Sequence, residues 1–157
     1  PTMYEYISEG MRNNKKTLLV CEIKPSEINT ARGKKTAVLA VATIKKLKAD
    51  KNTCYISFDY DILKQIRAID SKTSLQYLEG NKSPKEVKAD KINGIDYHYS
   101  VFQKHTEWIQ EAKDNKMILN AWTVNETADM DWIIAHEFNY ITTNEPELLM
   151  QRVKSNR

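Results

Sequence analysis

Glycine is scarce in this sequence, and its scarcity argues against a common class of phosphate-binding site. Only four glycines occur among 157 residues, and no GxGxxG or GxxxxGK pattern is present. The phosphate loops of nucleotide-binding sheets depend on glycine, because their backbone approaches the phosphate closely. The sequence also contains no HExxH motif and no Ser-His-Asp or Cys-His arrangement that would indicate a familiar hydrolase.

Cysteine is scarcer still. The two cysteines, Cys21 and Cys54, fall inside predicted strands, with no CxxC motif and no metal-ligand spacing. Buried cysteines of this kind behave as small apolar residues. We therefore predict two free thiols rather than a disulfide.

Long apolar runs and a large net charge are missing as well. No run approaches the ~20 apolar residues that a membrane span needs, so no transmembrane segment is predicted. The chain carries 24 Lys and Arg against 21 Asp and Glu, a net charge of +3. The basic residues lie mostly beside acidic ones on predicted helices, which is typical of a solvated surface and gives no reason to expect nucleic acid. Because the sequence opens at Pro1, a periplasmic, secreted or cytoplasmic location all stay open.

The chain does contain a regular alternation of strand-like and helix-like segments. The predicted strands are short and apolar or aromatic-rich, and they span residues 17–24, 53–58, 74–78, 94–99, 117–122 and 140–143. Helices are predicted at 1–14, 34–50, 59–70, 83–90, 105–115, 125–137 and 144–155, of which 83–90 is short and polar. Helix caps are expected at Asp59, Asn125 and Asn144.

Strands that alternate with helices over short links predict an α/β fold with a parallel sheet, because parallel strands need a covering crossover. An open doubly wound sheet and a closed (βα)8 barrel both fit this pattern. The absence of glycine-rich loops favours the barrel. No linker or change of composition divides the chain, so residues 1–157 are expected to form one domain.

The first predicted strand, in "TLLVCEIKPS", ends with two charges. Because side chains alternate along a strand, Val20, Glu22 and Lys24 share one face, opposite Cys21 and Ile23. Ligands of α/β proteins bind at the carboxyl ends of the strands. Glu22 could therefore hold Mg²⁺ or Ca²⁺, which prefer oxygen ligands, and Lys24 could hold an anionic group. The alternative is a partly buried structural ion pair.

Further candidates stand where the other strands end. Phe58, Tyr77, His98 and Trp122 are predicted to line the same rim, with Trp122 as a wall for substrate. Tyr77 has packing as its alternative role. The remaining histidines and tryptophans fall on helices and are expected to pack there.

Four segments resemble successive parts of the glycerophosphodiester phosphodiesterase family. They are "LLVCEIKP", "YISFDYDILKQIRAID", "MILNAWTVNE" and "YITTNEPELL". The opening "PTMYEYI" is similar to the helix that precedes the EIK strand of that family, and the resemblance runs in order to about Arg152. It implies a (βα)8 barrel that hydrolyses glycerophosphodiesters, in lipid metabolism, to an alcohol and glycerol 3-phosphate with a divalent metal, Ca²⁺ or Mg²⁺.

The resemblance also implies roles for individual residues. Glu22 matches the metal-binding glutamate of the EIK strand, and Lys24 matches the adjacent lysine of the phosphate pocket. Trp122 matches the tryptophan of WTVN at the pocket wall, and Phe58 an aromatic near the same mouth. In that setting a cation polarises the phosphoryl oxygens, and Lys24 offsets developing charge as a catalytic group.

The sequence departs from the family in two ways. Asn144 stands where the family usually has aspartate before the proline. More importantly, the His-Arg-Gly strand, the Glu-x-Asp metal pair and the His-Asp turn are absent, and 157 residues fall short of the ~250 typical of this barrel. We therefore expect an incomplete barrel with about six βα units, the carboxyl-terminal two-thirds, whose upstream strands belong to the parent protein and which is inactive alone.

Two other functions stay open at this point. One is a non-catalytic barrel that binds a phosphodiester or sugar-phosphate without hydrolysing it. The other is an unrelated open α/β interaction domain, in which Glu22 and Lys24 form only a structural pair. The alcohol head group and the oligomeric state are not indicated by the sequence.

Overall fold

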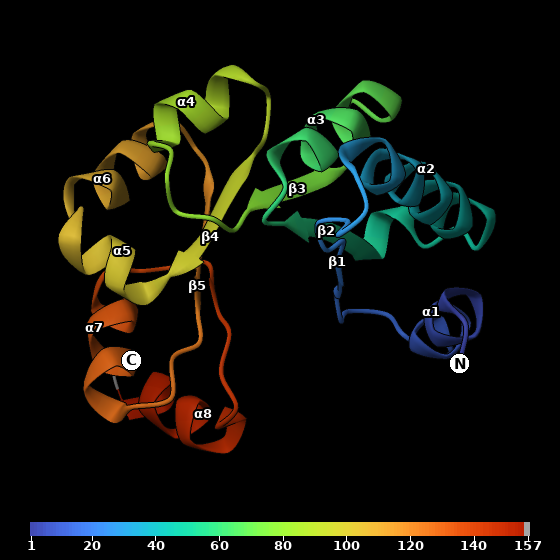
Figure 1. Ribbon diagram of the computed structural model, residues 1–157. Coiled ribbons are helices and arrows are strands. Elements are labelled where there is room, and N and C mark those ends of the chain that lie inside the picture. The colour runs from blue at the N-terminus through green and yellow to red at the C-terminus, as the bar shows by residue number, and fades with distance from the viewer. Residues whose placement is uncertain (156–157) are drawn as a thin grey trace. The chain divides into compact units, whose positions relative to one another are not determined.

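The computed structural model describes residues 1–155 and shows short parallel strands alternating with helices (Figure 1). The described chain forms two compact units. Unit 1 comprises Pro1–Tyr77 and Asp90–Ile92, and unit 2 comprises Leu78–Ala89 and the residues from Asn93 onward.

Unit 1 contains a parallel sheet of three strands, β1 (Leu19–Glu22), β2 (Thr53–Ser57) and β3 (Ser74–Tyr77). The pairing places Glu22 opposite Ile56 and Ile56 opposite Gln76. Residues aligned in this way point to the same face of the sheet. This row therefore identifies the face that carries Glu22.

Three α-helices accompany these strands: α1 (Met3–Met11), α2 (Thr30–Lys46) and α3 (Tyr60–Ile69). The start of α1 is a capping box, in which Thr2 accepts the Glu5 N–H and the Glu5 carboxylate accepts the Thr2 N–H. These hydrogen bonds hold the pKa of Glu5 below its usual value.

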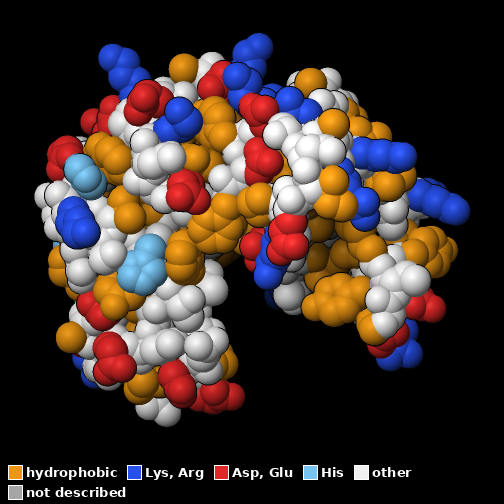
Figure 2. Space-filling view, in the orientation of Figure 1, with side chains coloured by type: hydrophobic (Ala, Val, Ile, Leu, Met, Phe, Trp, Pro, Cys, Tyr) orange, Lys and Arg blue, Asp and Glu red, His pale blue; other side chains and the backbone are white. Residues whose placement is uncertain are grey.

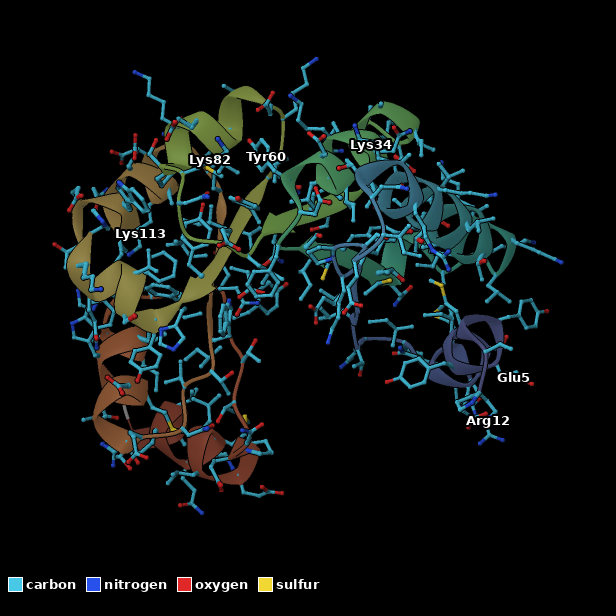
Figure 3. All side chains as sticks on the ribbon, viewed as in Figure 1. Glu5, Arg12, Lys34, Tyr60, Lys82 and Lys113 are labelled. Atoms are coloured by element: carbon cyan, nitrogen blue, oxygen red, sulfur yellow. The ribbon has the colours of Figure 1, made fainter. Side chains whose placement is uncertain are left out.

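Helices α2 and α3 lie side by side in unit 1 (Figure 1). Gly33 allows their close approach, since a Cβ at this position would lie 3.2 Å from the Ile62 side chain. Lys34 on α2 reaches α3, where its Nζ lies 3.1 Å from the Asp61 carboxylate (Figure 3). Apolar residues of both helices form the core beneath them: Ala37, Val41, Ile44, Ile62, Leu63 and Ile66.

Unit 2 has its own parallel strands, β4 (Gly94–His98), β5 (Ile118–Trp122) and β6 (Tyr140–Ile141). The pairing places His98 opposite Trp122. The helices of this unit are α4 (Pro84–Ala89), α5 (Tyr99–Lys104), α6 (Glu107–Asp114), α7 (Thr127–Ala135) and α8 (Pro146–Ser155).

Tyr97 identifies the face of β4 that packs against helices. Its ring stacks on Phe102 of α5 at 5.7 Å and lies 6.2 Å from the Trp108 ring of α6. Its hydroxyl donates to the Lys82 carbonyl, next to the start of α4. Because side chains alternate, His98 must point to the opposite face of the strand.

The structure confirms the alternation of strands and helices and corrects three details. All six predicted strands occur within residues 1–155, each with trimmed ends. Residue Tyr99, predicted as strand, begins the unpredicted helix α5. Asn125 is not the cap of α7, whose N-cap residue is Glu126, and α8 begins at Pro146, so Asn144 does not cap it either.

Both cysteines are free, as predicted, with Cys54 buried and Cys21 half-buried. None of the helices in residues 1–155 combines the length and apolar character that crossing a bilayer requires. The prediction that the whole chain forms a single domain stays a prediction.

The Arg67 side chain should contribute strongly to the stability of unit 1. Its guanidinium donates to the carbonyls of Asp70, Thr73 and Lys91 at 2.8–3.0 Å. We expect Arg67→Met to lower the free energy of unfolding by about 2–3 kcal/mol, because three carbonyls lose a charged donor. Urea denaturation followed by circular dichroism measures this loss.

Lys64→Met is the matched control on the same helix. Lys64 is half-exposed and pairs with Asp90 at 3.7 Å, and an exposed ion pair contributes little. Its replacement should change the free energy of unfolding by less than about 0.5 kcal/mol. If both variants lower the free energy of unfolding equally, the three carbonyl contacts of Arg67 do not stabilise unit 1 more than an exposed ion pair does.

Candidate functional site

The carboxyl end of β1 exposes a carboxylate and an ammonium. Burial alternates along this segment as expected: Val20, Glu22 and Lys24 are exposed, whereas Cys21 is half-buried and Ile23 is only 4% exposed. Within residues 1–155, neither Glu22 nor Lys24 takes part in an ion pair or a side-chain hydrogen bond. A structural ion pair between them is therefore not what the structure shows.

Ser57 fixes the backbone beside this pair. Its hydroxyl donates to the Ile23 carbonyl at 2.6 Å and accepts the Asp59 N–H at 3.0 Å. The Ile23 N–H donates to the Ile56 carbonyl, which extends the pairing of β1 and β2 past the strand end. The chain on both sides of Phe58 is thus held close to the segment that carries Lys24, and the Phe58 side chain is half-buried there.

At the end of β3, Gln76 and Tyr77 point to opposite faces of the sheet. Gln76 lies in the same row and on the same face as Glu22, is 2% exposed, and its Oε1 has no hydrogen-bond partner. Tyr77 points to the opposite face, where its ring meets the Tyr60 ring of α3 at 4.7 Å. The structure thus gives Tyr77 a packing position, and its predicted contact with substrate stays untested.

Unit 2 brings His98 and Trp122 together, as expected for neighbouring strand ends. Their rings meet edge to face with centroids 5.1 Å apart, and both side chains are half-buried. The Trp122 Nε1–H donates to the Asp96 carbonyl at 2.8 Å. This bond uses the polar edge of the indole within the sheet, so the ring offers only apolar surface to a ligand.

Three neighbours hold the His98 ring. Besides Trp122, the Tyr99 ring stacks on it at 4.5 Å, and Ser100 contacts its Nδ1 with both the backbone N–H and the hydroxyl. Ser100 was missed by the sequence analysis because the strand was extended through Tyr99. The sequence offered no clear signal for this contact, because histidine is not among the usual helix-capping residues.

Polar residues in the loops after β5 and β6 form hydrogen bonds with one another. The Asn125 Oδ1 accepts the Asn144 N–H at 2.9 Å and the Thr143 hydroxyl at 3.3 Å. The Thr143 hydroxyl in turn accepts the Glu145 N–H at 2.9 Å. These bonds tie together the two loops at the carboxyl ends of the strands.

The described residues supply one candidate metal ligand rather than a complete site. No group of three or more His, Cys, Asp or Glu residues within residues 1–155 is arranged to hold a metal ion. Hard cations usually take six or more oxygen ligands, several of them from protein carboxylates. Glu22 fits one such ligand, and the others are not provided by the part of the chain described.

Comparison with known proteins identifies the relatives of this chain. The family model described as the glycerophosphoryl diester phosphodiesterase family matches residues 1–148. No curated protein gives a significant match.

Solved structures give the same result. A glycerophosphodiester phosphodiesterase from Parabacteroides distasonis is 33% identical, with a TM-score of 0.95 over 99% of this chain. A phosphodiesterase from Oleispira antarctica, solved with the product sn-glycerol-3-phosphate, is 19% identical, with a TM-score of 0.77 over 98% of this chain. A glycerophosphodiester phosphodiesterase from Agrobacterium tumefaciens is 16% identical, with a TM-score of 0.75 over 99% of this chain. The chain spans 65%, 61% and 62% of these three structures, respectively. The predicted α/β class of the (β/α)8 barrel type is confirmed.

Thiol labelling can test whether Cys21 points away from the face of β1 that carries Val20 and Glu22. Burial, assisted by the nearby Cys54 thiol, raises the pKa of Cys21 to about 11. Since the thiolate is the reactive form, we expect iodoacetamide to modify Cys21 at pH 8 about a hundredfold more slowly than an exposed thiol. The rate should rise about tenfold per pH unit until the pH approaches the pKa.

The matched control is the Val20→Cys variant with Cys21 and Cys54 replaced by alanine. Val20 is 59% exposed, so the introduced thiol should react at the rate of an ordinary thiol. Mass spectrometry of the labelled protein measures both rates. If Cys21 reacts as fast as the introduced thiol, then β1 does not present Glu22 and Val20 on a separate face.

Proposed function

The chain belongs to the glycerophosphoryl diester phosphodiesterase family, and we propose on this basis that it forms part of an enzyme that hydrolyses a glycerophosphodiester to an alcohol and glycerol 3-phosphate with a divalent cation. The family match over residues 1–148 carries this proposal. The exposed Glu22 and Lys24 at the carboxyl end of β1 support it, because these are the residues that the EIK motif matches.

The cation we propose is Ca²⁺ or Mg²⁺. Glu22 would supply one oxygen ligand, and its carboxylate is exposed and free of competing ion pairs among the described residues. When bound, the cation would stabilise negative charge on the phosphoryl oxygens as a Lewis acid. Its other ligands would come from outside these 157 residues.

Lys24 would bind the phosphoryl group directly. It stands two residues after Glu22, so the two side chains leave the strand on the same side. No carboxylate among the described residues neutralises its ammonium. A fixed positive charge near the reacting phosphorus stabilises the charge that develops on the phosphoryl oxygens in the transition state.

We assign to His98, Trp122 and Phe58 the role of contacting the substrate. The Trp122 indole presents an apolar wall because its N–H is already bonded to the Asp96 carbonyl. The His98 ring beside it keeps Nε2 for a ligand, since within the described chain only Nδ1 is hydrogen-bonded. For Tyr77, whose ring packs against Tyr60, contact with the substrate stays a prediction.

The acid and base groups of the reaction would lie outside this chain. The sequence contains no His-Arg-Gly strand, Glu-x-Asp pair or His-Asp turn, and it spans 65% of the Parabacteroides structure. Unit 1 also contains an apolar groove along one edge of β1, and no described strand of this unit pairs with that edge. This groove supports the proposal that a further segment of the parent protein packs there. It is lined by Met3, Tyr6, Ile7, Leu18, Leu19, Val20, Cys21 and Glu22. Figure 2 shows hydrophobic side chains gathered beside α1.

Glu22, Lys24 and Trp122 also fit a second candidate function, because none of them is an acid–base histidine. A barrel that binds a phosphodiester or sugar-phosphate without hydrolysing it would keep Glu22, Lys24 and Trp122 and lose the histidines. The residues upstream of Pro1 in the parent protein distinguish the two functions. A His-Arg-Gly strand followed by a His-Asp turn there would decide for the enzyme.

The 157-residue chain alone should not hydrolyse glycerophosphocholine, because no acid–base histidine of the family is present in it. Release of choline and glycerol 3-phosphate, followed with Ca²⁺ and with Mg²⁺, measures the activity. The parent protein assayed in parallel is the positive control. Turnover by the isolated chain at the parent's rate would contradict the proposal that the missing segments carry the acid and base.

In the parent protein, Glu22→Gln should remove a metal ligand while preserving side-chain size. We expect weaker Ca²⁺ and Mg²⁺ binding by calorimetry and a value of kcat/KM about 100–1,000-fold lower, because transition-state charge loses its stabilisation. Lys24→Met should lower kcat/KM but leave metal affinity unchanged, since Lys24 is not a ligand.

Glu27→Gln is the control, because Glu27 is an exposed carboxylate that follows the same strand without belonging to the EIK motif. It should leave both measurements unchanged. If Glu22→Gln leaves the affinity for both cations unchanged, Glu22 is not a metal ligand and the proposed cation site is overturned.

A further inference from the structure

The three histidines of this chain are held in different ways through the same ring atom. At His98, Nδ1 faces the Ser100 N–H at 3.3 Å and the Ser100 hydroxyl at 2.8 Å. At His136, Nδ1 lies 2.7 Å from the Trp132 carbonyl, and at His105 it lies 3.2 Å from the Glu107 carboxylate.

These contacts determine where the ring proton resides. A backbone N–H can only donate, so Nδ1 of His98 must accept, and the neutral ring then carries its proton on Nε2. A carbonyl or carboxylate oxygen can only accept, so Nδ1 of His136 and His105 must carry a proton. His98 is thus the histidine that presents an N–H on the nitrogen that faces away from its own backbone.

The surroundings of His98 hold its ring as well as its proton. Tyr99 stacks on one side, with an interplanar angle of 29°, and Trp122 meets the ring edge to face at 83°. The ring therefore has little freedom to rotate and exchange the positions of Nδ1 and Nε2. Within residues 1–155, Nε2 itself is not hydrogen-bonded to any protein group.

We propose that Ser100 is a positioning residue that keeps His98 in the Nε2–H form, so that His98 donates a hydrogen bond to a phosphoryl oxygen of the substrate. This inference rests on the function proposed above. A phosphodiester oxygen is an anionic acceptor, and an N–H donor to such a group makes a strong hydrogen bond. The other neutral tautomer would present a lone pair at Nε2, which repels the same oxygen.

The donor at Nε2 does not depend on the charge of the ring. Both the neutral Nε2–H form and the protonated imidazolium carry a proton on Nε2. The Ser100 hydroxyl can donate or accept, so the Ser100 backbone N–H is the contact that favours the Nε2–H form. The hydroxyl contact, at 2.8 Å, adds to the hold on the ring but does not itself choose between the two neutral tautomers.

The first test measures the tautomer itself, in the isolated 157-residue chain. Protonated and unprotonated ring nitrogens have well-separated ¹⁵N chemical shifts, and three histidines give a readily assigned spectrum. At alkaline pH, where the rings are neutral, we expect the Nε2–H form at His98 and the Nδ1–H form at His136. Ser100→Pro, which removes the backbone N–H in the first turn of α5, should convert His98 to a mixture of both forms, and Ser100→Ala, which keeps this N–H, should retain the Nε2–H form.

Ser83→Ala is the matched control, because Ser83 also caps a short helix of unit 2, where its Oγ accepts the Glu86 N–H. It should leave the ¹⁵N shifts of His98 unchanged. If Ser100→Pro also leaves them unchanged, Ser100 does not select the tautomer and the positioning role is overturned, whatever the activity of the parent protein.

The second test measures glycerophosphocholine hydrolysis by the parent protein. Ser100→Pro should raise KM about tenfold, because a hydrogen bond to an anionic group is weakened in the bound state, whereas Ser100→Ala, which keeps the N–H, should leave KM nearly unchanged. An unchanged KM, in a variant whose His98 tautomer is mixed, would overturn the contact between His98 and the phosphoryl oxygen. A parent protein inactive on glycerophosphodiesters would remove the proposed function and this contact with it, while the spectra would still decide the role of Ser100.

Discussion

The period-two alternation of side chains along the parallel strands is the constraint on which the candidate site depends. In β1 it sends Cys21 and Ile23 toward buried positions and leaves Val20, Glu22 and Lys24 exposed. A shift of pairing by one residue would exchange the two sets. The bond from the Ser57 hydroxyl to the Ile23 carbonyl opposes such a shift, because it fixes the register at the point where the strand ends.

The existence of the strands was predictable because each is a short apolar segment between helical patterns. Their ends were less predictable where an apolar or aromatic run continues into the next element. In the segment from Gly94 to Phe102, aromatic residues continue past the strand, and the change to helix is made by the His98 side chain, which accepts the Ser100 N–H. Histidine is not among the usual capping residues, so the start of α5 carried no recognisable signal.

Site residues could be predicted when the alternation within their own strand determines which face they occupy. They were harder to predict when that face depends on how the strand pairs with its neighbour. Glu22 and Lys24 could be placed from the alternation within β1 alone. The side of β3 on which Tyr77 lies depends on its pairing with β2, and that pairing puts Gln76, not Tyr77, in the row of Glu22. Gln76 could not be singled out, because a glutamine inside an apolar strand gives no sign of its face until the register is known.

The exposure of Glu22 has a consequence for how well it can serve as a metal ligand. In unit 1 as described, this carboxylate lies at an open, apolar groove beside Val20, so water competes for it and weakens any electrostatic attraction. A polypeptide segment packed in that groove would bury the apolar side chains of Leu18 and Val20 and lower the dielectric constant around the carboxylate. The same segment could then strengthen cation binding without contributing every ligand, because the attraction between charges rises as water is excluded. Closure of the groove and assembly of the proposed metal site would thus be coupled.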